Sequence, residues 1–206
     1  MPHFQSTSIT AALLLSSALA AFAVPASAGD AAQGAVIAQS VCVGCHGPDG
    51  NSPQTNLPKL ASQRPSYLIR ELQAFQSGKR PSEIMQALAA SLSEADIANL
   101  AAYYASQPLA PGQVTQPKLL QSGKAVYFNG NPDNGLPSCD SCHGENGRGD
   151  GDIPSIAAQN VDYLHEELRR YATGQRPHGK RVMRTVAQRI TPEEAEALAQ
   201  FIASLR

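Results

Sequence analysis

The chain has 206 residues and a nearly balanced charge, with 16 Lys and Arg against 17 Asp and Glu. This balance argues against a nucleic-acid-binding protein, which would carry an excess of basic residues. The chain has no Trp and only nine aromatic residues after residue 28. Side chains alone therefore provide little material for a large apolar core.

The first 28 residues contain a short apolar run that ends at Ala26-Ser27-Ala28. This pattern is typical of a secretory signal with an A-x-A cleavage site. The usual positive charge before the run is missing, so a retained membrane anchor is the alternative, although the run is short for a membrane span. We predict that residues 1–28 are a signal peptide cleaved after Ala28 and that the mature chain, beginning at Gly29, is exported to the periplasm.

The next feature is a pair of Cys-x-x-Cys-His motifs, which use all four cysteines of the chain. They are Cys42-Val43-Gly44-Cys45-His46 and Cys139-Asp140-Ser141-Cys142-His143. Two thiols at this spacing can add to the two vinyl groups of one haem, and the following His can bind its iron. The sequence therefore predicts two covalently bound haem c groups, with His46 and His143 as iron ligands.

Three other interpretations of the cysteines are weaker. A structural zinc site would need further ligands at finger spacing, which His165 and His178 do not provide. A redox dithiol is expected to follow a strand in a βαβ unit, and little of this sequence alternates like a strand. Disulfides fit an exported protein, but they would leave each motif's His without a role.

An internal repeat divides the mature chain into two similar halves. The motif histidines are 97 positions apart, and the pattern from Gln63 to Phe75 returns from Gln159 to Tyr171. A repeat of this length indicates a duplicated domain. The Pro- and Gly-rich segment 107–112 separates the copies, so we predict one domain over 29–110 and a second over 111–206. Because domains this small have little core of their own, we expect bound haem to complete each core and the apo-protein to be largely unfolded.

The remaining pattern is helical. Asp30 is expected to cap a first helix, and Ser93 and Thr191 are expected to open the last helix of each half. Between them we predict helices over 67–75 and 163–171, which have apolar residues at helical spacing. The sequence therefore predicts an all-α fold.

The methionines are candidates for the second iron ligands. After the signal, Met85 and Met183 are the only two, and they lie 39 and 40 residues after the motif histidines. A helical Met more often fills a core, but the matched placement favours axial ligation. His178, five residues before Met183, is a competing ligand for the second iron, whereas we expect His165 to be solvated.

From Gly29 onward the chain resembles the cytochrome c4 family, which consists of two tandem class I cytochrome c domains, each wrapped around one covalent haem. The resemblance rests on Cys42-x-x-Cys45-His46-Gly47-x-Asp49-Gly50, on Leu57-Pro58-Lys59-Leu60 and on Asp133-x-Gly135-x-Pro137-x-Cys139. It implies that the carbonyls of Pro58 and Pro154 accept a hydrogen bond from the axial histidines. It also implies helix crossings of Gly34 against Tyr103 or Tyr104 and of Gly123, with Tyr127, against Phe201. Ser155 replaces the Lys found at position 59, which we expect to affect only a surface contact.

The function that the resemblance implies is one-electron transfer without a small-molecule substrate, from the bc1 branch to a terminal haem-copper oxidase. The alternative is a subunit of a periplasmic dehydrogenase such as a flavocytochrome c sulfide dehydrogenase. An enzyme or gas sensor would need an open iron site. Lys180, Arg181, Arg184 and Arg189 form a local basic cluster. It is read most simply as a solvated loop. Docking of an acidic partner, or peripheral association with anionic membrane headgroups, is the other interpretation.

Overall fold

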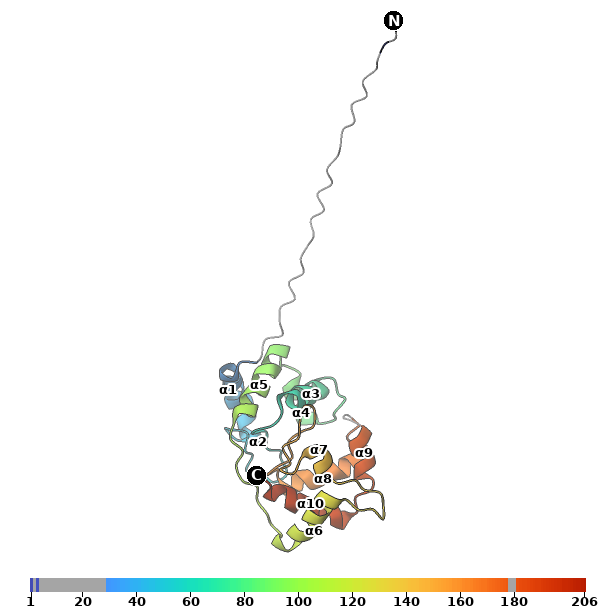
Figure 1. Ribbon diagram of the computed structural model, residues 1–206. Coiled ribbons are helices and arrows are strands. Elements are labelled where there is room, and N and C mark those ends of the chain that lie inside the picture. Colours follow the sequence, from blue (N-terminus) through green and yellow to red (C-terminus); the bar gives the residue numbers. More distant parts are fainter. Residues whose placement is uncertain (2, 4–28, 178–180) are drawn as a thin grey trace.

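The structure is a computed structural model that describes Met1, His3 and residues 29–177 and 181–206 (Figure 1). The predicted signal peptide after His3, and also His178 and Lys180, lie outside the described residues. Within that described part the chain forms helices joined by loops and turns, without a β-strand, which confirms the all-α prediction. No described helix combines the length and apolarity needed to cross a membrane.

The helices follow the same order in both halves of the chain. The first half contains α1 (Ala31–Ile37), α2 (Val43–His46), α3 (Pro65–Gln76), α4 (Glu83–Ala89) and α5 (Glu94–Ser106), with a π-helical turn at Ala38–Cys42. The second contains a 3-10 turn at Pro117–Leu119, α6 (Leu120–Asn129), α7 (Asp140–His143), α8 (Val161–Thr173), α9 (Arg181–Ala187) and α10 (Pro192–Ser204). The π-helical turn has no counterpart in the sequence prediction.

The predicted helix starts are present. The Asp30 carboxylate accepts hydrogen bonds from the first turn of α1. Ser93 and Thr191 form capping boxes with Asp96 and Glu194, in which each side chain pairs with the other residue's backbone N–H. These bonds satisfy backbone donors that have no partner inside a helix.

A glycine brings two helices into close contact in each half. A Cβ on Gly34 in α1 would lie 2.0 Å from the carbonyl oxygen of Asn99 and 2.8 Å from Cβ of Tyr103 in α5. A Cβ on Gly123 in α6 would lie 2.8 Å from Cβ of Phe201 in α10. The expected crossings are therefore confirmed, with Tyr103 rather than Tyr104 facing Gly34.

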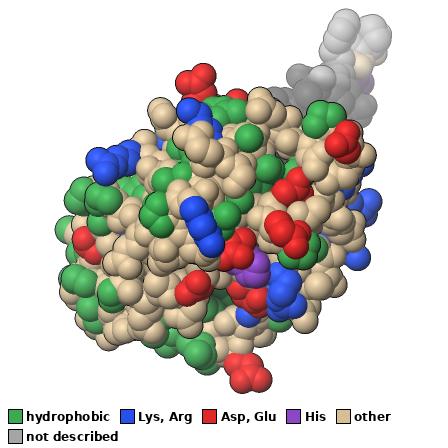
Figure 2. All heavy atoms as spheres, turned by 90° about the horizontal axis from the view of Figure 1, so that it is seen from below, with side chains coloured by type: hydrophobic (Ala, Val, Ile, Leu, Met, Phe, Trp, Pro, Cys, Tyr) green, Lys and Arg blue, Asp and Glu red, His purple; other side chains and the backbone are tan. Residues whose placement is uncertain are grey.

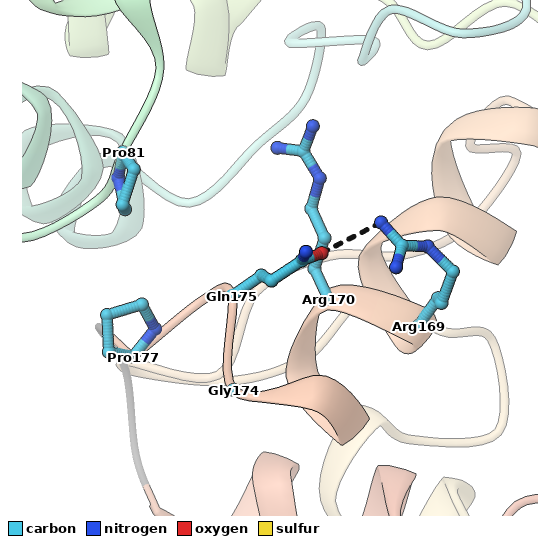
Figure 3. Close-up of a pocket in the computed structure, with 6 residues that line it drawn as sticks. All are labelled: Pro81, Arg169, Arg170, Gly174, Gln175 and Pro177. Carbon is cyan, nitrogen blue, oxygen red and sulfur yellow. Dashed lines mark hydrogen bonds between the residues drawn. The ribbon is translucent and has the colours of Figure 1, made fainter.

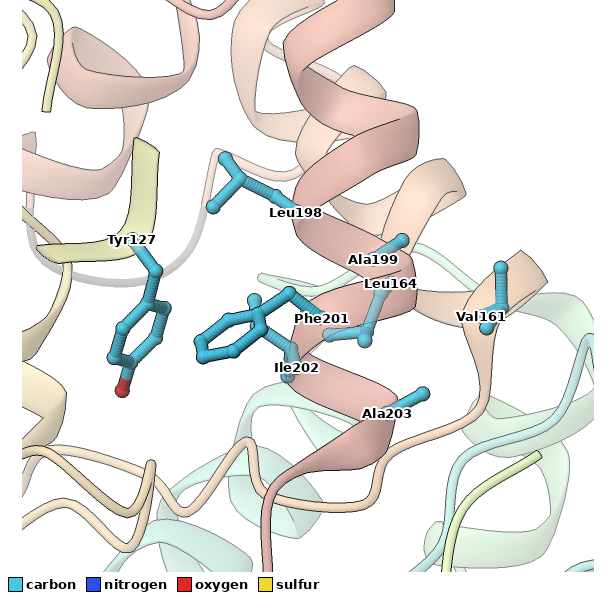
Figure 4. Packing of buried hydrophobic residues seen from close by; sticks show 8 residues of the cluster. All are labelled: Tyr127, Val161, Leu164, Leu198, Ala199, Phe201, Ile202 and Ala203. Atoms are coloured by element: carbon cyan, nitrogen blue, oxygen red, sulfur yellow. The ribbon is translucent and has the colours of Figure 1, made fainter. Parts of the chain in front are cut away.

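Each half has its own apolar cluster. In the first half, Leu68 of α3 packs with Leu100 and Tyr104 of α5. In the second half, Tyr127 and Leu164 pack with Leu198, Phe201 and Ile202 of α10 (Figure 4). Figure 1 shows the α1–α5 pair and the α6–α10 pair at opposite ends of the molecule. The boundary near residue 110 stays a prediction.

The halves meet through paired hydrogen bonds between glutamine side chains and main-chain groups, which repeat in a pseudo-twofold arrangement. Gln63 donates to the carbonyl of Ser155 and accepts from its N–H, both at 2.8 Å. Gln159 donates to the carbonyl of Lys59 at 3.0 Å and accepts from its N–H at 2.7 Å. Because each glutamine closes two bonds to one residue of the other half, these contacts fix the orientation of both halves.

The expectation for position 155 was wrong. Ser155 and Lys59 are both buried at this interface instead of lying on the surface. The Lys59 ammonium donates to the carbonyls of Ala110 and Pro111, each at 2.9 Å, and so ties the connecting segment to the first half. The interface buries this position, which a sequence repeat alone does not reveal.

A buried charge network lies at the same interface. Arg80 pairs with Glu71 of its own half at 2.8 Å and with Glu167 of the other half at 3.1 Å. Arg176 mirrors this arrangement, since it pairs with Glu167 and, at 2.8 Å, with Glu71. Each arginine also donates to a tyrosine of the opposite half. We refer to these six residues as the interface network: Tyr67, Glu71, Arg80, Tyr163, Glu167 and Arg176.

Candidate haem sites

The last four residues of each Cys-x-x-Cys-His motif form a short helix, α2 or α7, and the first cysteine is the N-cap of that helix. A spacing of three residues corresponds to about one helical turn, so both cysteines of a motif lie on the same side. The motif histidines close the helices and are buried, whereas Cys45 and Cys142 are exposed. The next residue in each motif, Gly47 or Gly144, has φ near +75°. Glycine tolerates this conformation and ends the helix immediately after the His.

Both motif histidines have the same hydrogen bond to a proline. Nδ1 of His46 lies 3.0 Å from the Pro58 carbonyl oxygen, and Nδ1 of His143 lies 3.1 Å from that of Pro154. A carbonyl only accepts, so Nδ1 must carry the proton. Burial lowers the pKa of both rings and the proline bond partly offsets this effect, which leaves each imidazole neutral at neutral pH.

This arrangement meets the requirements of haem binding. In the described part of the chain, Nε2 of neither ring is hydrogen-bonded to a protein group. A neutral imidazole with protonated Nδ1 and an unpaired Nε2 is the tautomer that binds a metal ion, and the proline bond fixes the ring. The residues present therefore fit a histidine-ligated haem beside each motif.

The cysteines do not have the character of a redox dithiol. Burial raises the pKa of the Cys42 thiol, and burial together with Asp140 raises that of Cys139 to about 12. These thiols remain protonated, whereas dithiol catalysis needs a thiolate. Among the described residues, no three side chains of His, Cys, Asp or Glu gather as a zinc site would require.

The methionines occupy equivalent positions on α4 and α9. Both helices have seven residues, and Met85 and Met183 are each the third. Both side chains are half-buried. The pairing of each Met with a motif His across a haem stays a prediction. His165 is exposed on α8, as expected.

A cleft of about 510 Å³ opens between the halves, apart from the predicted haem-site residues (Figure 3). Pro81 of the first half and a set of residues from the second half line it, namely Arg169, Arg170, Gly174, Gln175 and Pro177. Its arginines are already paired with Glu166, and Arg169 also donates to Gln175 at 2.8 Å. The cleft therefore offers no unpaired arginine to a ligand.

Comparisons with known proteins agree with this geometry. A model of the cytochrome c family matches residues 120–206, and a model described as cytochrome c oxidase, cbb3-type, subunit III matches residues 29–103. Cytochrome c4 of Thiocapsa roseopersicina is 37% identical over 183 residues, which cover 86% of this chain and 93% of that protein. The chain belongs to the cytochrome c4 family.

Structural similarity extends over the same region. The crystal structure of reduced recombinant cytochrome c4 from Pseudomonas stutzeri matches with a TM-score of 0.82 and 34% identity, covering 87% of this chain and all of that one. A thiosulfate dehydrogenase electron acceptor of Thiomonas intermedia is 31% identical, with 79% of this chain and 77% of that protein covered. As a member of the cytochrome c4 family, the chain has two cytochrome c domains, binds two covalent haem c groups and transfers electrons.

Sequence reasoning missed two features of the molecule. Gln63 and Gln159 were visible as members of the repeat, but the repeat did not indicate that they face each other's half. The buried hydroxyl of Tyr104 was not recognised either, since the sequence presents Tyr104 only as an apolar position of α5.

Proposed function

We propose that this protein is an exported di-haem electron carrier of the periplasm. In this proposal His46 and Met85 bind the iron of the first haem, and His143 and Met183 bind that of the second. Cys42, Cys45, Cys139 and Cys142 form the thioether bonds. The observation that carries the proposal is the repeated histidine geometry, in which each buried ring is held through Nδ1 by Pro58 or Pro154.

The protein's task in this reaction is to hold and insulate its cofactors. When bound, each haem supplies the one-electron chemistry through its ferrous and ferric states. The proline carbonyls orient the imidazoles and raise their donor strength. The thioether of a methionine favours the reduced state more than a second imidazole would. The interface network and the paired glutamines hold both halves in one arrangement, so that electrons can pass between sites within one molecule.

Ligand binding to the reduced holo-protein tests whether the sites are closed. If both irons have a His and a Met ligand, carbon monoxide should bind slowly and incompletely. Rapid binding at one haem would instead support an enzyme or gas sensor. The Met85→Ala variant is the matched positive control, because it should open one site while both haems stay attached.

For the direction of electron flow, we propose a bc1-type donor and a terminal haem-copper oxidase as acceptor. The two methionine-bearing helices support distinct docking faces. The exposed Ile84 of α4 follows Glu83, whereas the exposed Val182 of α9 follows Arg181. On the face shown in Figure 2, acidic and basic side chains are interspersed.

The charge difference supports the proposal that the α9 face docks an acidic partner. Arg184 of α9 occupies the place of Gln86 in α4, so Arg184→Glu should slow electron exchange with the partner that docks on α9. Gln86→Glu introduces the same side chain at the equivalent position of the other face, with half the change in charge, and is the control. Stopped-flow rates with purified bc1 complex and oxidase, measured at several salt concentrations, would show which partner responds. If neither rate changes with Arg184→Glu, α9 is not a docking face.

A second candidate is the electron acceptor of a periplasmic dehydrogenase. The similarity to the thiosulfate dehydrogenase electron acceptor of Thiomonas intermedia favours it over a flavocytochrome c sulfide dehydrogenase subunit. Co-purification with an endogenous dehydrogenase, and reduction of both haems on addition of thiosulfate, would support this candidate. Isolation as a free protein that the oxidase oxidises would support the carrier.

A further inference from the structure

Tyr104 has a buried hydroxyl group without a hydrogen-bond partner among the described residues. The residue is 3% exposed. Its neighbour Tyr103, on the same helix, donates its hydroxyl to the Pro48 carbonyl at 2.6 Å. A buried hydroxyl that lacks a partner costs folding free energy, so its presence in the core needs an explanation.

The Tyr104 ring is fixed in position beside Cys42. The π-helical turn brings Cys42 against the apolar cluster to which Tyr104 belongs. A Cβ on Gly50 would lie 2.7 Å from Cδ1 of the Tyr104 ring, so the loop after the first motif closes over it. The backbone carbonyl of Tyr104 accepts a bond from Ser62 at 2.8 Å. Burial and the Cys42 thiol raise the pKa of Tyr104, which keeps the hydroxyl protonated and able to donate.

Among the described residues of the second half, the position equivalent to Tyr104 has no hydroxyl. Ile202 is equivalent to Tyr104, because its carbonyl accepts a bond from Ala158, and Ala158 shares with Ser62 a positive φ. Cys139 packs against the cluster of Ile202 as Cys42 packs against that of Tyr104. The hydroxyl is therefore a polar difference between otherwise equivalent positions beside the first cysteine of each motif.

We propose that the Tyr104 hydroxyl donates a hydrogen bond to the Cys42 sulfur of the holo-protein and raises the reduction potential of the first haem. This inference rests on the proposed attachment of haem to Cys42. A free thiol can donate to a hydroxyl, but a thioether sulfur has no proton and only accepts. Attachment thus leaves Tyr104 as the donor.

The direction of the effect follows from charge. A donor at the sulfur withdraws electron density from the edge of the attached group, which favours the reduced state. The effect is strong in a dry core, where a dipole is poorly screened. Ile202 provides no donor, and the Tyr127 hydroxyl already donates to the Gly144 carbonyl at 2.6 Å. The effect is therefore confined to the first haem.

The test compares Tyr104→Phe with Tyr103→Phe in the holo-protein. Each variant removes one hydroxyl and keeps the ring, and NMR signals of the thioether bridges identify each haem during a redox titration. Tyr104→Phe should shift the first haem to lower potential and move the Cys42 bridge resonances, with the second haem unchanged. An unchanged first potential, an equal shift of both haems or an equal effect of Tyr103→Phe would overturn the proposal.

A measurement on the unmodified protein gives an independent test. The Tyr104 hydroxyl proton should exchange slowly and show a nuclear Overhauser effect to the Cys42 β-protons. A hydroxyl proton that exchanges rapidly with water would overturn the proposal even if the variants failed to fold. Mass spectrometry of haem-bearing peptides from the same sample shows whether Cys42 carries a thioether bond, so a free Cys42 thiol would refute the proposed attachment instead.

Discussion

Replacing Arg176 by Met should destabilise the holo-protein by about 3–5 kcal/mol, because it removes one member of a buried charge network. The side chain of Arg176 is 4% exposed and pairs with Glu71 and Glu167, whose side chains are 6% and 10% exposed. Without Arg176, the buried cation left to both carboxylates is Arg80, since Arg70 and Arg170 lie 3.7 Å from Glu71 and Glu167 and are more exposed. The Arg176 guanidinium also lies over the ring of Tyr171, 4.6 Å from its centroid. Met keeps an apolar side chain at this place and loses the cation, so the loss comes chiefly from the uncompensated charge of the carboxylates.

Arg169→Met is the matched control on α8. Its ion pair with Glu166 is exposed on both sides, at 47% and 40%, so its removal should cost about 1 kcal/mol or less. Guanidinium chloride unfolding, followed by far-ultraviolet circular dichroism and by haem absorbance, measures both values. Equal destabilisation by the two variants would refute the reasoning.

A double-mutant cycle sharpens the test. Removing Glu71 and Arg176 together leaves Arg80 paired with Glu167, so Glu71→Gln combined with Arg176→Met should cost less than the sum of the single changes. Strict additivity would show that these residues do not act as one network.

Three further predictions concern ligation, packing and pH. Met85→Ala and Met183→Ala should each open one iron to added imidazole while both haems stay attached. If the iron of the second haem stayed low-spin and closed in Met183→Ala, another residue would be its ligand. Gly34→Ala should lower the free energy of unfolding, measured by chemical denaturation, by about 1–3 kcal/mol, because the added Cβ would overlap α5. Gly44→Ala should change it little, because a Cβ there meets no atom within 4 Å. Hydrogen bonds from Arg169, and then from Arg170, lower the pKa of Glu166 from 4.5 to about 2. The pairing therefore stabilises the fold fully above pH 4.5, and this stabilisation is lost as the pH falls towards 2. An NMR titration of Glu166 with a midpoint near 4.5 would contradict this prediction.

Local features of the fold could be predicted because the sequence encodes them in neighbouring residues. The two capping boxes each lie within four consecutive positions, Ser93 to Asp96 and Thr191 to Glu194. Gly34 and Gly123 could be assigned to helix crossings because the resemblance to a known family indicated which aromatic residues they meet. The cysteine motifs themselves restrict the chemistry to few alternatives.

The contacts between the halves could not be predicted in this way. Gln63 and Ser155 are 92 positions apart, and Lys59 and Gln159 are 100 apart. A duplicated pattern indicates two similar folds, but it does not determine which faces meet. Burial of Lys59 contradicts the usual expectation for a lysine, and its partners are backbone carbonyls that have no sequence signature. Likewise, the Tyr104 hydroxyl lacks a hydrogen-bond partner because of the residues packed around it. The spacing of apolar residues along α5 does not indicate this.

The central claim is that the protein is a two-site electron carrier with a His and a Met ligand on each iron. An optical redox titration of the purified holo-protein, followed through the iron–methionine charge-transfer band of the ferric state, tests it most directly. We predict two titrating haems, both at positive potential and both with this band. A haem that lacks the band, and that titrates at much lower potential or is high-spin, would contradict the claim.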